Sequence, residues 1–120
     1  MRKLIYLITL TFIPYFAHAA EVTGTWTASF ETQVGTQNYT YEFQVQGTEL
    51  TGTAKSANGE VAIQSGKVDG NAITFVEKLN FQGMELIITY TGELVSDNEI
   101  QFKRDVAGIA MEELVAKRSQ

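Results

Sequence analysis

Two charged side chains fall inside apolar strand patterns, which is where a site for chemistry would be built. Glu77 follows Phe75, and Arg104 follows Phe102, each at a spacing of two residues. Side chains two apart share one face of a strand, so both charges are expected on the inner face of a sheet. One interpretation is a buried Glu77–Arg104 pair at one mouth of a barrel, where it holds the polar head group of a ligand. The other is that both lie near strand ends, where a β-bulge or water relieves them.

Catalysis finds little support among the same residues. Glu77 and Glu85 could pair as general acid and base, but their parity does not place them on a common inner face. His18 is the only histidine, and the chain contains no cysteine. If His18 is lost with an export signal, neither a Ser-His-Asp nor a Cys-His nucleophile system can form, nor can a His/Cys zinc site. We therefore expect no enzyme activity, no metal site and no cofactor.

Residues 1–19 have the composition of an export signal. A basic start precedes an apolar run over 4–16, and the small residues Ala17 and Ala19 fit a signal-peptidase site. The run is shorter than the ~20 residues that a membrane-spanning helix needs. We expect cleavage after Ala19. Residues 20–120 would then form one domain with no membrane span, in the periplasm or outside the cell.

The charge of the mature chain argues against two classes of partner. The full sequence has 9 Lys and Arg against 14 Asp and Glu. The signal takes Arg2 and Lys3 with it, which leaves seven basic residues against fourteen acidic ones, a net charge of −7. Nucleic acids and anionic membranes are bound by clustered basic residues. We therefore expect neither as a partner, and the sequence identifies no protein partner.

The rest of the chain alternates apolar and polar residues in short runs. The predicted strands cover 22–30, 39–47, 49–57, 60–68, 71–79, 84–95, 99–106 and 111–118. Period two with one apolar face is typical of half-buried antiparallel strands, and the turns are too short for parallel crossovers. The pattern leaves a two-sheet sandwich or a closed barrel, and we predict an all-β, eight-stranded antiparallel up-and-down barrel. The longest connection, 31–38, is predicted to be a lid over one mouth.

The interior of such a barrel can be filled or hollow. Four glycines near mid-strand, at positions 24, 52, 66 and 92, mark places where a closing sheet bends most. Large and small inward residues could interlock into a solid core, or the small ones could leave a cavity. The candidate lining residues of that cavity are Tyr41, Phe43, Phe75, Glu77, Tyr90, Phe102 and Arg104. The turn over 81–84 is apolar, which suits either a partner or lid contact or ordinary loop packing.

Two short segments carry a resemblance to a known group of barrels. The sequences Gly24-Thr25-Trp26 and Leu50-Thr51-Gly52-Thr53, with a basic residue on the last strand, resemble the calycins, which include lipocalins, fatty-acid-binding proteins and avidins. The segments look most like the avidins, and the turn rhythm is similar to small secreted bacterial domains of uncharacterised function. The resemblance implies that Trp26 lies at the closed end of the barrel under a basic residue of the last strand. Arg118 is the first choice for this residue, and Lys117 is the second. Avidin-like biotin sites use several tryptophans, so a single tryptophan does not support biotin binding.

These observations converge on a binding protein. The leading hypothesis is an exported, non-catalytic barrel that holds a small apolar or amphiphilic ligand in its interior. The alternative is an interaction module with a solid core, which meets another protein or a carbohydrate through its outer face or a strand edge.

Overall fold

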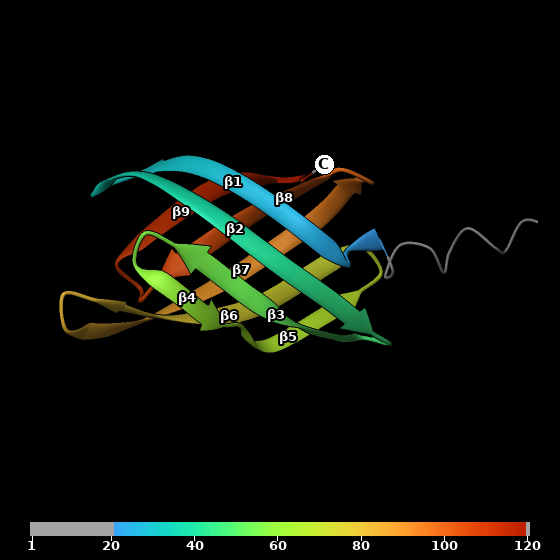
Figure 1. Ribbon diagram of the computed structural model, residues 1–120, viewed down its shortest axis with the longest axis horizontal. Coiled ribbons are helices and arrows are strands. Elements are labelled where there is room, and N and C mark those ends of the chain that lie inside the picture. Colours follow the sequence, from blue (N-terminus) through green and yellow to red (C-terminus); the bar gives the residue numbers. More distant parts are fainter. Residues whose placement is uncertain (1–20, 120) are drawn as a thin grey trace, which may run out of the picture.

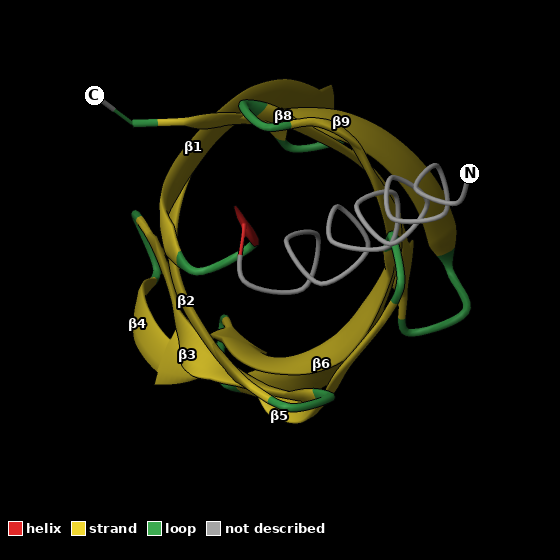
Figure 2. Cartoon of the chain, turned by 90° about the vertical axis from the view of Figure 1, so that its right-hand side faces the viewer, coloured by secondary structure: helices red, strands yellow, loops and turns green. Residues whose placement is uncertain are grey.

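The computed structural model describes residues 21–119, which form an antiparallel sheet closed into a barrel (Figures 1 and 2). The strands are β1 (Gly24–Thr32), β2 (Gly35–Gln46), β3 (Glu49–Ser56), β4 (Gly59–Ala62), β5 (Gln64–Asp69), β6 (Ala72–Phe81), β7 (Met84–Ser96), β8 (Glu99–Val106) and β9 (Ala110–Arg118). Sequence neighbours pair with each other except β4 and β5, which both pair with β3, and β1 pairs with β9, so the sheet has up-and-down order and closes on itself. This confirms the predicted fold class and excludes the sandwich.

The predicted strand 60–68 is present as two pieces. β4 and β5 flank Ile63, and both pair with β3, through Thr53↔Ala62 and Leu50↔Gly66. The backbone N–H of Ile63 still donates to the carbonyl oxygen of Gly52 at 3.0 Å. β4 and β5 are therefore two halves of one strand with an irregularity between them, and the barrel has eight strands in space.

The segment 31–38 differs from the prediction. β1 continues to Thr32 and β2 begins at Gly35, so a tight turn replaces the expected lid. The turn is held by Thr32, whose hydroxyl donates to the carbonyl oxygen of Gly35 at 2.9 Å and accepts from the N–H of Val34 at 3.1 Å. Apolar alternation reveals a strand only where one face is buried. Here the hairpin extends past the core and both faces are largely exposed, so the signal is missing.

Glycines allow close approach at two mid-strand positions. Gly52 has φ = +147°, and a Cβ there would lie 1.7 Å from the carbonyl oxygen of Glu42 on β2. At Gly92, a Cβ would lie 2.3 Å from the ring of Phe102. The second case shows that a small residue on one strand admits a large ring from its neighbour. The space at Gly92 is therefore occupied by Phe102.

Trp26 and Arg118 meet at one end of the barrel. The guanidinium carbon of Arg118 lies 4.4 Å from the centre of the Trp26 ring. Its Nε donates to the carbonyl oxygen of Asp97 and its Nη1 to that of Thr23, both at 2.9 Å. The indole Nε1 of Trp26 donates to the carbonyl oxygen of Val22 at 2.9 Å. Arg118 thus links the start of β1, the β7–β8 turn and β9 across a fully buried tryptophan.

Gly24 and Lys117 complete this arrangement. A Cβ at Gly24 would lie 2.6 Å from Nη1 of Arg118, so the glycine provides room for the guanidinium. Lys117, the alternative partner of Trp26, pairs instead with Glu99 at 3.4 Å, and its side chain is 64% exposed. The structure therefore places Arg118, and not Lys117, against the tryptophan.

Replacing Arg118 should destabilise the fold without changing it. Arg118→Ala removes the cation–π contact and leaves carbonyl groups without their donor, so we expect a loss of about 1–3 kcal/mol in the free energy of unfolding. Lys117→Ala removes only an exposed ion pair and should change stability by less than about 0.5 kcal/mol. Urea denaturation of both variants checks this. Equal stability losses would refute a special role for Arg118.

Candidate functional site

A cavity of about 240 Å³ lies at the end of the barrel opposite Trp26. The turns of this end are those of the β1–β2, β3–β4, β6–β7 and β8–β9 hairpins, and the β6–β7 hairpin projects past its neighbours (left in Figure 1). The lining is predominantly apolar, and Arg104 and Glu112 are its charged residues. It comprises Thr32, Gln33, Val34, Gln37, Asn58, Leu79, Phe81, Met84, Leu86, Ile88, Arg104, Val106, Ile109, Ala110 and Glu112.

The rim and the floor of this cavity differ in character. Val34, Met84 and Ile109 come from three different hairpins, and they are 64%, 61% and 73% exposed. Ile88 and Arg104 are the most deeply buried of the lining residues. An apolar rim therefore surrounds an opening that leads down to one guanidinium.

Arg104 is enclosed by acceptors and aromatic rings. Its Nε donates to Oε1 of Glu112 at 2.7 Å, and its Nη1 donates to the hydroxyl of Tyr90 at 2.8 Å. Its guanidinium carbon lies 4.8 Å from the ring centre of Phe30 and 5.1 Å from that of Tyr39. Residues from β1, β2, β7 and β9 thus converge on one side chain of β8.

Glu77 lies beside Arg104, does not line the cavity, and is almost fully buried. Its Oε2 accepts from the hydroxyl of Tyr39 and its Oε1 from the hydroxyl of Tyr90, both at 2.8 Å. Oε1 also lies 3.7 Å from Nη1 of Arg104. The sequence left open whether Glu77 and Arg104 form a buried pair or are relieved at strand ends. The structure brings them together, and tyrosine hydroxyls satisfy the carboxylate.

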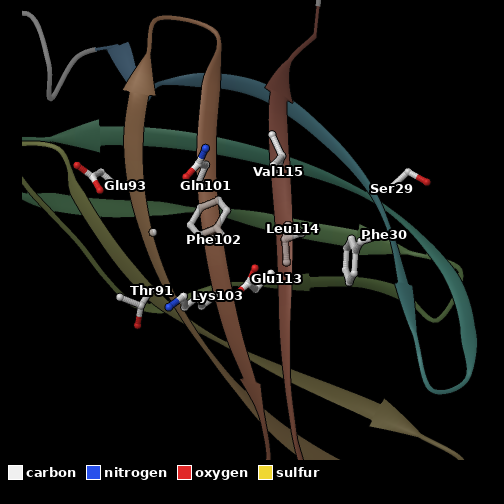
Figure 3. A pocket seen from close by; sticks show the side chains of 11 residues that line it. Ser29, Phe30, Thr91, Glu93, Gln101, Phe102, Lys103, Glu113, Leu114 and Val115 are labelled. Atoms are coloured by element: carbon white, nitrogen blue, oxygen red, sulfur yellow. The ribbon is translucent and has the colours of Figure 1, made fainter.

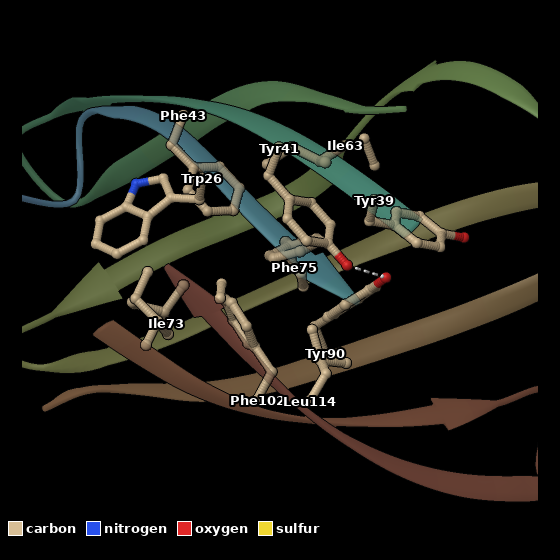
Figure 4. Packing of buried hydrophobic residues seen from close by; sticks show 14 of the residues in the cluster. Trp26, Tyr39, Tyr41, Phe43, Ile63, Ile73, Phe75, Tyr90, Phe102 and Leu114 are labelled. Atoms are coloured by element: carbon tan, nitrogen blue, oxygen red, sulfur yellow. Dashed lines mark hydrogen bonds between the residues drawn. The ribbon is translucent and has the colours of Figure 1, made fainter. Parts of the chain in front are cut away.

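The tyrosine hydroxyls form a chain with a defined direction. Because the Tyr90 hydroxyl donates to Glu77 and accepts from Arg104, the Tyr41 hydroxyl must donate across the 2.9 Å contact with Tyr90 (Figure 4). Tyr41 and Tyr90 are both completely buried. Each of these buried hydroxyls therefore has a partner, as a low-dielectric interior demands.

Burial dominates the ionisation of this cluster. It raises the pKa of the Glu77 carboxyl, although the hydrogen bonds from Tyr39 and Tyr90 and the charge of Arg104 oppose the shift. It also raises the pKa of the Tyr41 and Tyr90 hydroxyls well above their usual value. Burial acts to lower the pKa of Arg104, but its contacts with Tyr90 and Tyr39 outweigh this and the pKa is raised. At neutral pH the tyrosines are therefore neutral donors and Arg104 is a cation.

The aromatic residues expected to line a cavity pack against one another instead. The rings of Phe75 and Tyr90 are stacked at 4.2 Å, and Phe102 meets Phe75 edge-on at 5.7 Å (Figure 4). Tyr41 and Phe43 stack beside them at 5.7 Å. Of the seven residues predicted as lining, Arg104 lines the open-end cavity. At Gly92 the ring of Phe102 fills the space that a side chain would take.

Two important residues of the site were not among the predicted ones. Tyr39 shares strand parity with Tyr41, and Glu112 shares it with Leu114, so alternation placed both on the inner face. Tyr39 lay at the edge of the predicted strand 39–47, and Glu112 near the start of 111–118. Residues at strand ends give a weak signal for burial. Their contact with Arg104 depends on how strands distant in sequence close around it.

A second, shallower hollow of about 780 Å³ lies on the outer wall (Figure 3). β1 and β9 share a register of only two residue pairs, Trp26↔Arg118 and Thr27↔Lys117. Beyond these pairs, Ser29 and Phe30 face Glu113, Leu114 and Val115 across the hollow. It continues over β7 and β8, where its lining is polar. We call this hollow the outer groove; it shares no lining residue with the apolar cavity at the open end.

Two classes of feature are absent from the part of the chain that is described. No helix with the length and hydropathy of a membrane span occurs within residues 21–119. Across the same range, no group of three or more His, Cys, Asp and Glu residues is arranged to hold a metal ion. The predicted signal and its cleavage site at Ala19 lie outside the described residues.

The fold and this cavity define the chain as a closed antiparallel up-and-down β-barrel with an apolar opening at one end. Comparison with protein-family models and with curated proteins finds no match. Among solved structures, the chain is similar to a redesigned β-barrel, mFAP1, bound to DFHBI, with a TM-score of 0.55 and 12% sequence identity. The similarity covers 85% of this chain and 99% of that chain. At this identity the similarity supports the fold alone.

The direction of the tyrosine chain predicts unequal effects of two similar substitutions. Tyr90→Phe deprives Glu77, Arg104 and Tyr41 of a partner at once, whereas Tyr41→Phe removes one terminal donor. Since each buried group left unsatisfied costs about 1–3 kcal/mol, we expect Tyr90→Phe to lose about 3 kcal/mol and Tyr41→Phe about 1 kcal/mol. Urea unfolding measures both. A Tyr41→Phe loss as large as that of Tyr90→Phe would contradict the assigned direction.

The raised pKa of Glu77 predicts how stability depends on pH. In the unfolded chain the carboxyl releases its proton first as pH rises, so ionisation favours unfolding. The stability that the neutral carboxyl contributes is complete below its usual pKa and is lost as pH rises through the raised value. The side chain of Glu77→Gln stays neutral, so the stability of this variant relative to the wild type should increase as pH rises through this window. The free energy of unfolding of both proteins, measured over a pH series, checks this. Glu85→Gln, at an exposed position, is the control and should show the same dependence of unfolding free energy on pH as the wild type. The assignment would be contradicted if Glu77→Gln also showed the wild-type dependence.

Proposed function

We propose that this chain is an exported, non-catalytic barrel of the calycin type that binds a small apolar or amphiphilic ligand through its open end. The observation that carries the proposal is the cavity of about 240 Å³, with an apolar rim and the Arg104–Glu112 pair at depth. Binding sites for small molecules are concave and mostly apolar, with a few placed polar groups. The open end has each of these properties.

The rim gives the proposal further support. Val34, Met84 and Ile109 are more than half exposed, and they converge from separate hairpins on the same opening. Exposed apolar groups gathered at one site mark binding surfaces more often than scattered ones do. The cavity is slightly smaller than the roughly 300–1,000 Å³ of typical ligand pockets. We infer that a ligand inserts its apolar part into the cavity and extends past the rim.

The site of binding differs from the one expected from the sequence. The rings of Tyr41, Phe75 and Tyr90 occupy the barrel's middle, so the ligand sits above them and meets Arg104 and Glu112. The structural neighbour mFAP1 is a barrel bound to DFHBI, which makes ligand binding a reasonable use of this architecture. The proposal of export rests on residues 1–19 of the sequence.

The proposal that the chain is not an enzyme rests on its residue types and their placement. The sequence after Ala19 has neither histidine nor cysteine. Glu77 is buried inside the barrel, while Glu85 is exposed beside Asn80 on a neighbouring register position of β7. The two carboxylates that could have acted as acid and base therefore lie on opposite faces of the wall.

The outer groove favours a second candidate function. Its lining includes Glu93, Gln101, Lys103 and Glu113, which are polar groups suited to a protein or a carbohydrate. In this alternative the barrel is a scaffold, and its partner binds the outer wall. The aromatic rings in the middle of the barrel pack against one another, which is compatible with such a role.

Blocking the cavity separates the two candidates. Ala110 lines the cavity, and the adjacent Met111 is 69% exposed and does not line it. Ala110→Trp should reduce binding of the neutral apolar dye Nile red by at least about tenfold because the indole fills the opening. Met111→Trp is the matched control and should bind like the wild type. Fluorescence titration of the three proteins measures this.

Native mass spectrometry of protein purified from its original host adds an independent readout. A retained small molecule in the wild type that is lost in Ala110→Trp would support ligand binding. Failure of the wild type to bind Nile red, together with an empty barrel, would overturn the proposal in favour of the outer groove.

A further inference from the structure

The cavity's charges indicate which head group its ligand carries. This inference rests on the proposed function and deepens it. Arg104 and Glu112 are the charged residues of the lining, and Glu77 stands directly behind Arg104. Two carboxyl groups therefore share one guanidinium. An arginine at the bottom of an apolar cavity would ordinarily suggest an anionic ligand, but here its Nε and Nη1 groups already have acceptors in the protein.

Arg104 offers little to an incoming carboxylate. Nε is bound to Glu112 at 2.7 Å, Nη1 is bound to Tyr90 at 2.8 Å, and the ring of Phe30 lies 4.8 Å from the guanidinium carbon. Its side chain is 5% exposed. A carboxylate that paired with Nε of Arg104 would have to displace Glu112, which would leave the Glu112 carboxylate partly buried and without its partner. Breaking a buried pair in this way is strongly unfavourable.

Glu112 is the more accessible of the two charges. Its side chain is 13% exposed, against 5% for Arg104. Its Oε1 accepts the bond from Arg104, and the described residues supply no hydrogen bond to its Oε2. A carboxylate can accept about four hydrogen bonds. The polar group presented to a ligand is therefore an acceptor with unused capacity, and it carries a negative charge.

We propose that the ligand is an amphiphile whose head group donates hydrogen bonds to Glu112, an amine above all, and that the site discriminates against carboxylates. The apolar rim of Val34, Met84 and Ile109 holds the tail, and Oε2 of Glu112 receives the head. Arg104 acts as a positioning residue, since its bond to Oε1 fixes the carboxylate. An ammonium head would pair with the Glu112 carboxylate, whereas a carboxylate head would lie against a like charge.

A matched series of probes tests this inference. Decylammonium, decanol and decanoate share one apolar tail and differ in the head, and each is used below its critical micelle concentration. Their affinities are measured at neutral pH by displacement of Nile red. We expect the wild type to bind decylammonium at least about tenfold more tightly than decanoate, with decanol between them.

Two variants locate the effect. Glu112→Gln removes the charge but keeps an oxygen for Arg104, and it should reduce the preference for decylammonium over decanoate by about tenfold. Glu60→Gln removes an exposed charge at the same end of the barrel that lines neither the cavity nor the outer groove, so it should keep the wild-type preference. Binding of decanol should be similar in all three proteins, which shows that each variant retains its cavity.

The outcomes distinguish this inference from the function beneath it. Decanoate binding as tight as decylammonium binding would overturn the inference and leave ligand binding intact. The inference would also be overturned if Glu60→Gln shifted the preference as much as Glu112→Gln, because the effect would then come from the overall charge. Failure of Nile red and all three probes to bind the wild type would overturn the proposed function itself. The wild-type ratio decides the matter even if Glu112→Gln does not fold.

Discussion

The buried head group of Arg104 divides the interior of this barrel in two. Below it, aromatic rings and tyrosine hydroxyls fill the space and satisfy one another. Above it, the strands continue past the packed core and enclose an apolar cavity. A guanidinium at this depth is tolerable only because Glu77, Glu112 and Tyr90 supply acceptors from three other strands. Closure of the sheet is what brings those acceptors together.

The same arrangement sets the electrostatics of the open end. Arginine is the residue least able to lose its charge, so its neighbours adjust around it. The tyrosines remain neutral donors. Burial raises the pKa of Glu77, and the charge of Arg104 opposes this shift. Glu112 lies at the boundary between the network and the cavity, and it is the more exposed of the two charged residues that line the cavity. The polar character of the cavity thus follows from how the hydrogen bonds of the interior network are satisfied.

Much of the architecture could be predicted because alternation reports directly on burial. The runs containing Trp26, Tyr41 and Phe75 gave their strands and inner faces correctly, since each has one buried side. Alternation gave no strand signal at 31–38, where the hairpin extends beyond the core and period two disappears. It also did not reveal the break at Ile63, or the shifted register with β6 between Gln64 and Lys67, where Ser65 has a positive φ.

The sequence by itself determined the antiparallel up-and-down strands and their inward faces, because both depend on local periodicity and short turns. Closure was a prediction, which the pairing of β1 with β9 confirmed. Its resemblance to the calycins also indicated the pairing of Trp26 with Arg118. Only the tertiary structure decided what the interior holds. Whether Gly92 leaves a void or admits Phe102 depends on the register between β7 and β8, and whether Arg104 is free or committed depends on Glu112 arriving from β9. Such contacts join residues that no spacing rule relates, and they are fixed only when the sheet closes.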